Sequence, residues 1–446
     1  MKSIASGAPH QIGRPFPSVS VRAVAAQPTR SRKSSALIPI FVFSLAFPFF
    51  VYIGPTRMSP YRLVLVVTFV PCAIAWLSGT LGRIRLPDIL MLMAAAWGAV
   101  VLVDIHGAEG LQSAGIFVIE TFGPFLFARR YIRDFFTFQR MVKSLALVII
   151  LLLPFAVYEN VAGSPILIEL FGKILPVYPI IGSELRLGLR RAQATFEYSI
   201  LFGVVCSSAF ALSFYVNGAP KRRSGLLSSG LVGMAVVSSL SSGPLLSLVV
   251  QVLLIIWDKV TAHVTRRWGI LAAIVITSYI AVDLTSNRNP FDVFISYLTF
   301  NADTSYMRVH IWNYGTESVM QHPIFGTGLN EWEHPSWMGG SIDNFWLDIA
   351  VQYGLPGLLF VAGGFLSVCF GLGRLRNLSF EAAQCRKGLI ITICGLAFAI
   401  CTVHVWDAPY VLIIFLLGSG MWMFEPRNEG ALAPSAARTL HPARPD

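Results

Sequence analysis

Apolar stretches of about 20 residues recur along most of the chain, and short segments with charged or turn-forming residues separate them. A helix needs about 20 apolar residues to cross the hydrocarbon core of a bilayer. The pattern predicts about twelve spans, at 36–54, 61–78, 87–104, 111–128, 145–160, 198–216, 225–241, 244–258, 269–283, 345–372, 389–405 and 409–424. The seventh and eighth are divided at Gly243-Pro244, a pair that favours a turn.

The composition supports the same fold class. Hydrophobic residues make up 55% of the chain and charged residues 13%, whereas a soluble domain has about 25% charged residues. A soluble enzyme is therefore excluded. We predict an all-α polytopic membrane protein with two long outer loops, at about 161–197 and 284–343.

The distribution of basic residues predicts the orientation. If the amino terminus is cytoplasmic, 26 of the 34 Lys and Arg residues fall on the inner side, as the positive-inside rule requires. The net charge of +11 then needs no nucleic-acid partner. We predict a disordered cytoplasmic tail at 1–35, a membrane domain at 36–424 and a cytoplasmic tail at 425–446, so that both termini are cytoplasmic.

The first outer loop ends in a basic segment that runs against this bias. Arg186, Arg190 and Arg191 lie directly before the sixth span. A guanidinium can bind a phosphate through two hydrogen bonds, so an anionic lipid diphosphate is one candidate partner. The alternative is pairing with lipid headgroups or with Glu184 and Glu197.

The second outer loop contains a predicted interfacial helix over 304–321. Arg308, Trp312, Gly315 and Val319 recur on one face of it. A tight turn is predicted at Gly326-Thr327-Gly328. An amphipathic helix beside a bilayer can serve simply as an anchor, and this reading stays open beside a functional one.

The entry to the tenth span brings a carboxylate and an amide to the positive end of a helix dipole. Ser341 or Asp343 is the predicted N-cap, and Asn344 follows. Capping alone is an alternative to a catalytic role for Asp343. Within the fourth span, Glu120 would cost roughly 2.5 kcal/mol or more in hydrocarbon if unpaired, so it should face the protein interior, either toward an arginine or toward substrate.

Four motifs occur in order on the predicted outer side. They are Arg-Ala-x-x-Thr-Phe-Glu (191–197), Arg-x-x-x-Trp (308–312), His-Pro-x-x-Gly-x-Gly (322–328) and Asp-Asn-x-x-Leu-x(6)-Gly-x-x-Gly (343–357). This order resembles that of the bacterial O-antigen ligase and the O-antigen and exopolysaccharide repeat-unit polymerase family, over about 185–360. Two positions depart from the family, which commonly has His-Asn where this chain has Asp343-Asn344, and often Phe-Glu-His-Pro where it has Phe196-Glu197-Tyr198-Ser199.

The resemblance implies a metal-independent glycosyltransferase, without a cofactor, at the outer face of the bacterial inner membrane. Such enzymes transfer a glycan from undecaprenyl diphosphate to a sugar hydroxyl, either on another lipid-linked unit (polymerase) or on lipid A core (ligase). The implied partners are the undecaprenyl-diphosphate-linked oligosaccharide, membrane lipids and other polysaccharide assembly proteins. We favour the polymerase of exopolysaccharide or O-antigen, because no outer loop looks dedicated to a lipid A core acceptor.

The chemistry assigns roles to particular residues. Arginines stabilise charge on the leaving diphosphate, and a carboxylate or imidazole takes the proton of the attacking hydroxyl. Arg190, Arg191 and Arg308 are the predicted diphosphate ligands, with His322 as an auxiliary donor. The predicted base is Asp343, with Glu197 and His334 as rivals. The further candidates are Arg186, Glu120, Asn344 and Trp312.

Two other functions stay open from the sequence. A transporter or flippase of lipid-linked glycan would need ionisable residues along several spans, whereas Glu120 is nearly alone. An inactive membrane scaffold is the third possibility, if Asp343 does not replace the histidine that the family has there.

Overall fold

The computed structural model describes residues 36–182, 185–218, 222–286 and 302–425. The predicted tail at 1–35 lies outside these ranges, as do residues 426–446 of the predicted tail at 425–446 and the segment 287–301 of the second outer loop. Almost all regular structure in the described ranges is helical.

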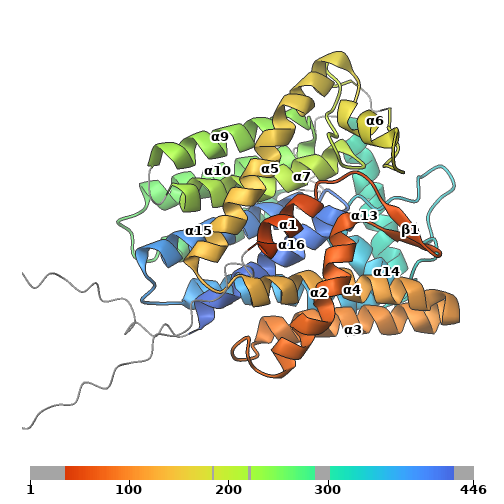
Figure 1. The fold of residues 1–446 in the computed structure, drawn as a ribbon, viewed down its shortest axis with the longest axis horizontal. Coiled ribbons are helices and arrows are strands. Elements are labelled where there is room, and N and C mark those ends of the chain that lie inside the picture. Colours follow the sequence, from red (N-terminus) through yellow and green to blue (C-terminus); the bar gives the residue numbers. More distant parts are fainter. Residues whose placement is uncertain (1–35, 183–184, 219–221, 287–301, 426–446) are drawn as a thin grey trace, which may run out of the picture.

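The helices form a bundle (Figure 1). They are α1 (Leu37–Ser44), α2 (Pro60–Leu77), α3 (Leu86–His106), α4 (Gly110–Tyr131), α5 (Phe135–Ala162), α6 (Ile166–Gly172), α7 (Ser199–Ser208), α8 (Phe210–Leu212), α9 (Arg222–Ser238), α10 (Ser242–Val260), α11 (Arg267–Thr285), α13 (Ala302–Gln321), α14 (Phe345–Arg374), α15 (Phe380–Ala399) and α16 (Asp407–Ser419). Short 3₁₀ or π turns follow α3, α8 and α16, at Gly107–Glu109 (η1), Ser213–Asn217 (η2) and Met421–Phe424 (η3).

Within the described ranges, nine helical stretches are long and apolar enough to cross a membrane. One of them, Leu86–Tyr131, contains two predicted spans. These are α3 and α4, which η1 joins and which pack side by side. The predicted seventh span is the 17-residue helix α9, slightly shorter than the other candidates. The all-α membrane fold is therefore confirmed, although the count of twelve is not.

The prediction of a membrane-spanning helix at 36–54 is wrong. α1 ends at Ser44 after 8 residues, and the chain then forms an antiparallel hairpin of β1 (Val51–Ile53) and β2 (Thr56–Met58). Eight residues rise only about 12 Å, which is too short for a bilayer. Gly54-Pro55 lies at the turn of the hairpin, where Gly54 has a positive φ of 61°.

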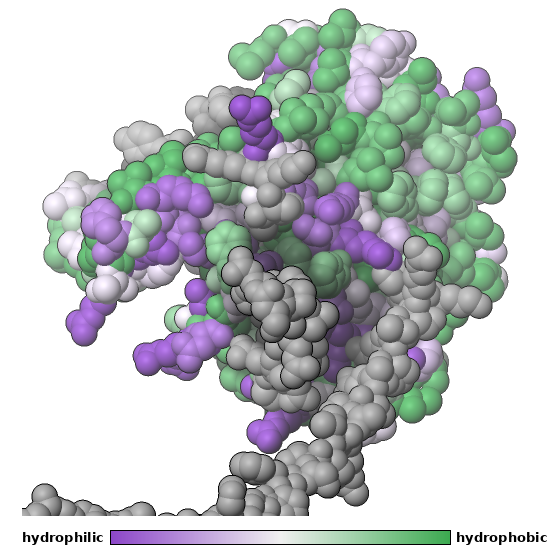
Figure 2. Space-filling model, turned by 60° about the vertical axis from the view of Figure 1, so that its left-hand side comes forward, coloured by the Kyte–Doolittle hydropathy of each residue, from purple (hydrophilic) through white to green (hydrophobic). Residues whose placement is uncertain are grey.

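The core forms around α16, which lies near the middle of the bundle (Figure 1). Every residue of α16 is buried, as expected for a helix that is apolar on all sides. It packs closely against α4, and Phe415 touches Phe41 of α1. The outer surface is the opposite: no residue of α11 is buried, and Figure 2 shows hydrophobic side chains over much of the visible face. Such a surface suits a lipid environment.

The predicted helix of the second outer loop is confirmed as α13, which packs on α14. Its predicted face is also confirmed, because Arg308, Gly315 and Val319 are buried and Trp312 is half-buried. The first outer loop contains the short helix α6.

The turn at 322–328 docks against a break in α14. Gly354 has φ 68° and ψ −179°, so the helix is interrupted there, and Leu355 N donates to Pro323 O at 2.8 Å. On the other side of the turn, Thr327 N donates to Val351 O at 2.8 Å. The predicted tight turn is present, with positive φ at both Gly326 and Gly328.

Gly354→Ala should therefore destabilise this junction. A Cβ at this position would overlap the carbonyl of Ile324, and alanine is also strained at a positive φ, at a cost of about 1–3 kcal/mol before the clash. We expect a lower midpoint of thermal unfolding in detergent. Gly373→Ala is the matched control on the same helix, because a Cβ there meets open space. Equal midpoints for the two variants would contradict the expected strain.

Candidate functional site

A cavity of about 430 Å³ brings together four of the residues singled out from the sequence. Arg186 and Arg191 come from the first outer loop, Arg308 from α13 and Asp343 from the segment before α14. The remaining lining residues are Ile181, Gln193, Tyr198, Ser199, Ile200 and Ser242. Segments far apart in the sequence thus place three cations and one carboxylate around one space.

The two loop arginines are fixed by the turn between α9 and α10. Arg186 Nη1 donates to Leu240 O at 2.8 Å, and Arg191 Nη2 donates to Ser241 Oγ at 2.8 Å. Leu240 itself has a positive φ of 46°. Since the turn contacts both guanidinium groups, it sets their positions before any ligand binds.

Arg308 is the most buried of these cations, with 7% of its surface exposed. Its Nη2 donates to Thr402 O at 3.1 Å, while Nε and Nη1 have no hydrogen-bond partner among the described residues. Burial lowers the pKa of Arg308, the Asp343 carboxylate raises it, and Arg186 lowers it. The guanidinium stays charged, so a bound anion would supply the partner that it lacks.

Asp343 is exposed and does not cap α14. The N-cap is Asn344, whose Oδ1 accepts from Trp346 N at 3.0 Å and from Leu347 N at 3.2 Å. The prediction of Ser341 or Asp343 as the cap is therefore wrong. Because the amide of Asn344 performs the capping, the carboxylate of Asp343 is available to the cavity.

A narrow extension of the site connects Arg308 with its neighbours. Arg308, Trp312, Asp343 and Asn344 line it together with Ile311, Leu347 and Cys401. Trp312 thus lies beside the arginine on the buried face of α13, and it forms part of the wall of the site.

Three predicted site residues lie elsewhere. Arg190 donates to Gly163 O at 2.5 Å and to Ile181 O at 3.2 Å, and it does not line the cavity. His322 lies beyond the end of α13, about 20 Å along the helix from Arg308. His334 contacts Glu331 at 3.1 Å and the ring of Trp332. The geometry gives Arg190 a structural position in its loop, and neither histidine lines the cavity.

Glu197 lies directly before the cavity residue Tyr198. Its Oε2 accepts from Trp406 Nε1 at 2.9 Å. The loop between α15 and α16 therefore reaches the edge of the site, and its contribution was not foreseen from the sequence.

Glu120 is paired with an arginine, one of the two alternatives that the sequence left open. Its Oε1 accepts from Arg62 Nε at 2.6 Å and from Tyr61 Oη at 2.7 Å. Arg62 Nη2 also donates to Asp407 Oδ1 at 2.8 Å, and Arg57 Nη2 donates to Asp407 Oδ2 at 2.6 Å. This buried ion network ties α2, α4 and α16 together.

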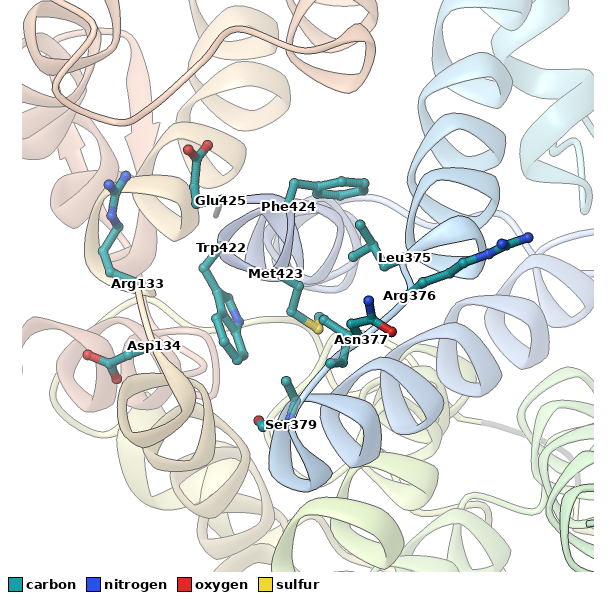
Figure 3. A pocket seen from close by; sticks show the side chains of 12 residues that line it. Arg133, Asp134, Leu375, Arg376, Asn377, Ser379, Trp422, Met423, Phe424 and Glu425 are labelled. Atoms are coloured by element: carbon teal, nitrogen blue, oxygen red, sulfur yellow. The ribbon is translucent and has the colours of Figure 1, made fainter. Parts of the chain in front are cut away.

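A second cavity of about 430 Å³ lies at the other end of α14, and Figure 3 shows it. Arg133, Asp134, Asn377 and Trp422 are among its lining residues, and the side chain of Arg376 extends away from the space. None of the site residues predicted from the sequence lines it. It also lies at the helix ends that the basic residues predict to be cytoplasmic, so it is not the candidate site.

Residues 227–362 match the family model described as O-Antigen ligase. This part of the chain is similar to the O-antigen ligase family. The match includes Arg308 and Asp343, and it begins after the loop that carries Arg186 and Arg191. No curated protein matches the chain. The apolar helices of the described residues indicate a multi-pass membrane protein.

Sequence reasoning missed several residues of the site. Gln193 lies within the 191–197 motif and Tyr198 directly follows it, but neither side chain is charged at neutral pH. Ser242 lies at the start of α10, where the sequence gave only a turn signal. Trp406 follows the eleventh predicted span and gave no signal beyond an aromatic residue at a membrane interface.

Proposed function

We propose that this protein polymerises lipid-linked repeat units of an exopolysaccharide or O-antigen at the outer face of the bacterial inner membrane. The observation that carries the proposal is the convergence of Arg186, Arg191, Arg308 and Asp343 on one cavity. Three cations from two separate segments suit the diphosphate of a polyprenyl carrier, because guanidinium groups bind phosphate oxygens in a bidentate manner.

In this proposal the reaction is a direct displacement. The acceptor hydroxyl attacks the anomeric carbon of the donor glycan, while the bond from that carbon to the diphosphate oxygen breaks and its electron pair stays with the diphosphate. Arg186, Arg191 and Arg308 stabilise this developing charge. Asp343 takes the proton of the hydroxyl, because it is the carboxylate that lines the cavity.

Ligation to lipid A core is the second candidate, and the description of the matched family favours it. A flippase is less well supported. Glu120, the intramembrane carboxylate singled out from the sequence, has Arg62 and Tyr61 as partners.

Reconstitution distinguishes these functions. Purified protein in liposomes is given lipid-linked repeat units alone, and glycan length is followed on a gel. We expect a ladder of longer glycans. A product that appears only after lipid A core is added would instead identify a ligase, and intact substrate moved across the bilayer without any transfer would identify a flippase.

A further inference from the structure

Three rings lie in series beside the arginine cavity. Tyr198 lines the cavity and is 39% exposed. Its ring lies 5.5 Å from that of Trp406 between centroids, with an angle of 75° between the planes, and Trp406 stacks on His404 at 5.0 Å with an angle of 25°. The series therefore extends from the cavity into the loop between α15 and α16.

Two carboxylates hold this series in position. Glu197 accepts from the indole of Trp406, and Asp348 Oδ2 lies 3.3 Å from Nδ1 of His404. Asp348 also accepts from Gln352 Nε2 at 3.0 Å. Trp406 packs between His404 and Tyr198. Tyr198 is the ring of the three that lines the cavity, and it is exposed, so it has a surface available to a ligand.

The backbone beside Trp406 is also constrained. Asp407 has a φ of 51°, which is unusual for a residue other than glycine. Its two carboxylate oxygens accept from Arg57 and Arg62. The buried ion network thus holds the loop in the conformation that presents Trp406 to Tyr198.

A rigid aromatic ring next to a carboxylate suits a sugar. The C–H face of a pyranose packs against an aromatic face, and its hydroxyl groups donate to nearby oxygen atoms. Sites for small molecules combine such apolar walls with a few placed polar groups. Tyr198 and Asp343 line the same cavity, so a sugar on Tyr198 would present its hydroxyl groups toward the proposed base.

We propose that Tyr198 is the stacking surface for the acceptor sugar, that Glu197 accepts hydrogen bonds from the hydroxyl groups of that sugar, and that Trp406 and His404 are positioning residues. This inference rests on the proposed function, because it assigns the second substrate of the same cavity. The donor diphosphate binds the arginines, and the acceptor pyranose binds Tyr198 in the same cavity.

The test measures sugar binding separately from transfer. The probe is the repeat-unit oligosaccharide released from its lipid carrier, and the protein is in lipid nanodiscs without sugar detergents. Saturation-transfer NMR should show ring protons of the oligosaccharide in contact with the wild-type protein and with Tyr198→Phe. The signal should be lost in Tyr198→Ala. Tyr52→Ala is the matched control, since Tyr52 is 60% exposed on β1 and does not line the cavity.

Kinetics with the same oligosaccharide as acceptor add a second measurement. Tyr198→Ala should raise the KM for the acceptor by about tenfold and change kcat little, as expected for lost packing that binds the ground state and the transition state alike. Binding of undecaprenyl diphosphate should be unchanged. Trp406→Phe, which keeps a ring but loses the bond to Glu197, should raise the acceptor KM less.

The outcomes separate the two proposals. Transfer that does not depend on Tyr198, or a wild-type protein that gives no sugar signal, would overturn the acceptor subsite. Sugar binding that depends on Tyr198, without any transfer, would support the subsite and overturn the polymerase. Unfolding midpoints near that of the wild type for both Tyr198 variants show that the losses do not come from misfolding.

Discussion

Arg308→Ala and Arg191→Ala should each reduce the rate of glycan transfer by more than about tenfold. This is the size expected when a preorganised charge contact to the leaving group is lost. Arg308 is buried, and two of its nitrogen atoms have no hydrogen-bond partner among the described residues. Its charge is therefore already oriented for an anion. The measurement is the initial rate of ladder formation in liposomes at equal amounts of folded protein.

Controls separate this effect from a general loss of charge. Arg376→Ala removes an exposed arginine at the opposite end of α14 and should leave the rate unchanged. Arg308→Lys should retain only part of the activity, because an ammonium cannot form the bidentate contact. Rates near that of the parent in both alanine variants would contradict the assignment of the cavity.

Asp343→Asn tests the proposed base. The amide has nearly the same size but cannot take a proton, so transfer should fall strongly while undecaprenyl diphosphate still binds. The matched variant Glu197→Gln should have a smaller effect on kcat. The reverse order would make Glu197 the base.

Arg62→Met should be among the most destabilising single substitutions in the membrane domain. It leaves Glu120 buried without its ion pair and removes one of the two arginines that hold Asp407. Breaking a buried pair by removal of one partner costs about 3–5 kcal/mol. We expect poor yield and a clearly lower midpoint of thermal unfolding in detergent.

Variants of the partner carboxylate give the internal comparison. Glu120→Gln should cost less than Arg62→Met, because Arg62 keeps Asp407 and glutamine still accepts from Tyr61. The double variant should be less destabilised than the sum of the two single variants, because the two residues interact directly. Glu109→Gln, at an exposed position in η1, should have no effect. Equal midpoints for Arg62→Met and this control would contradict a structural role for the network.

The failure of the first predicted span has a physical explanation. Residues 36–54 are apolar enough for a helix, but hydropathy measures only the solvent that a segment prefers, not its backbone conformation. α1 packs its side chains inside the bundle against Phe127 and Phe415, and Gly54-Pro55 favours the turn of the hairpin that follows. Local turn chemistry and tertiary packing together overrode the apolar pattern.

The candidate site shows the same division. Arg186 and Arg191 were identified because they run against the charge bias, and Arg308 because it is an isolated charge on an amphipathic helix. Arg190 lies next to Arg191 in the same basic segment, but its side chain donates to backbone carbonyls of its own loop. Charge alone could not distinguish Arg190 from Arg191, because the direction of each side chain depends on the fold of the loop.

The sequence by itself indicated a membrane environment, the helical fold class and the predicted outer segments with unusual charge, because these depend on composition and on local periodicity. Only the tertiary structure decided which charges meet. The cavity joins residues from 181 to 343, Asn344 rather than Asp343 caps α14, and the loop before α16 brings Trp406 to Tyr198. Contacts between distant segments depend on how the helices pack, and no local pattern encodes that packing.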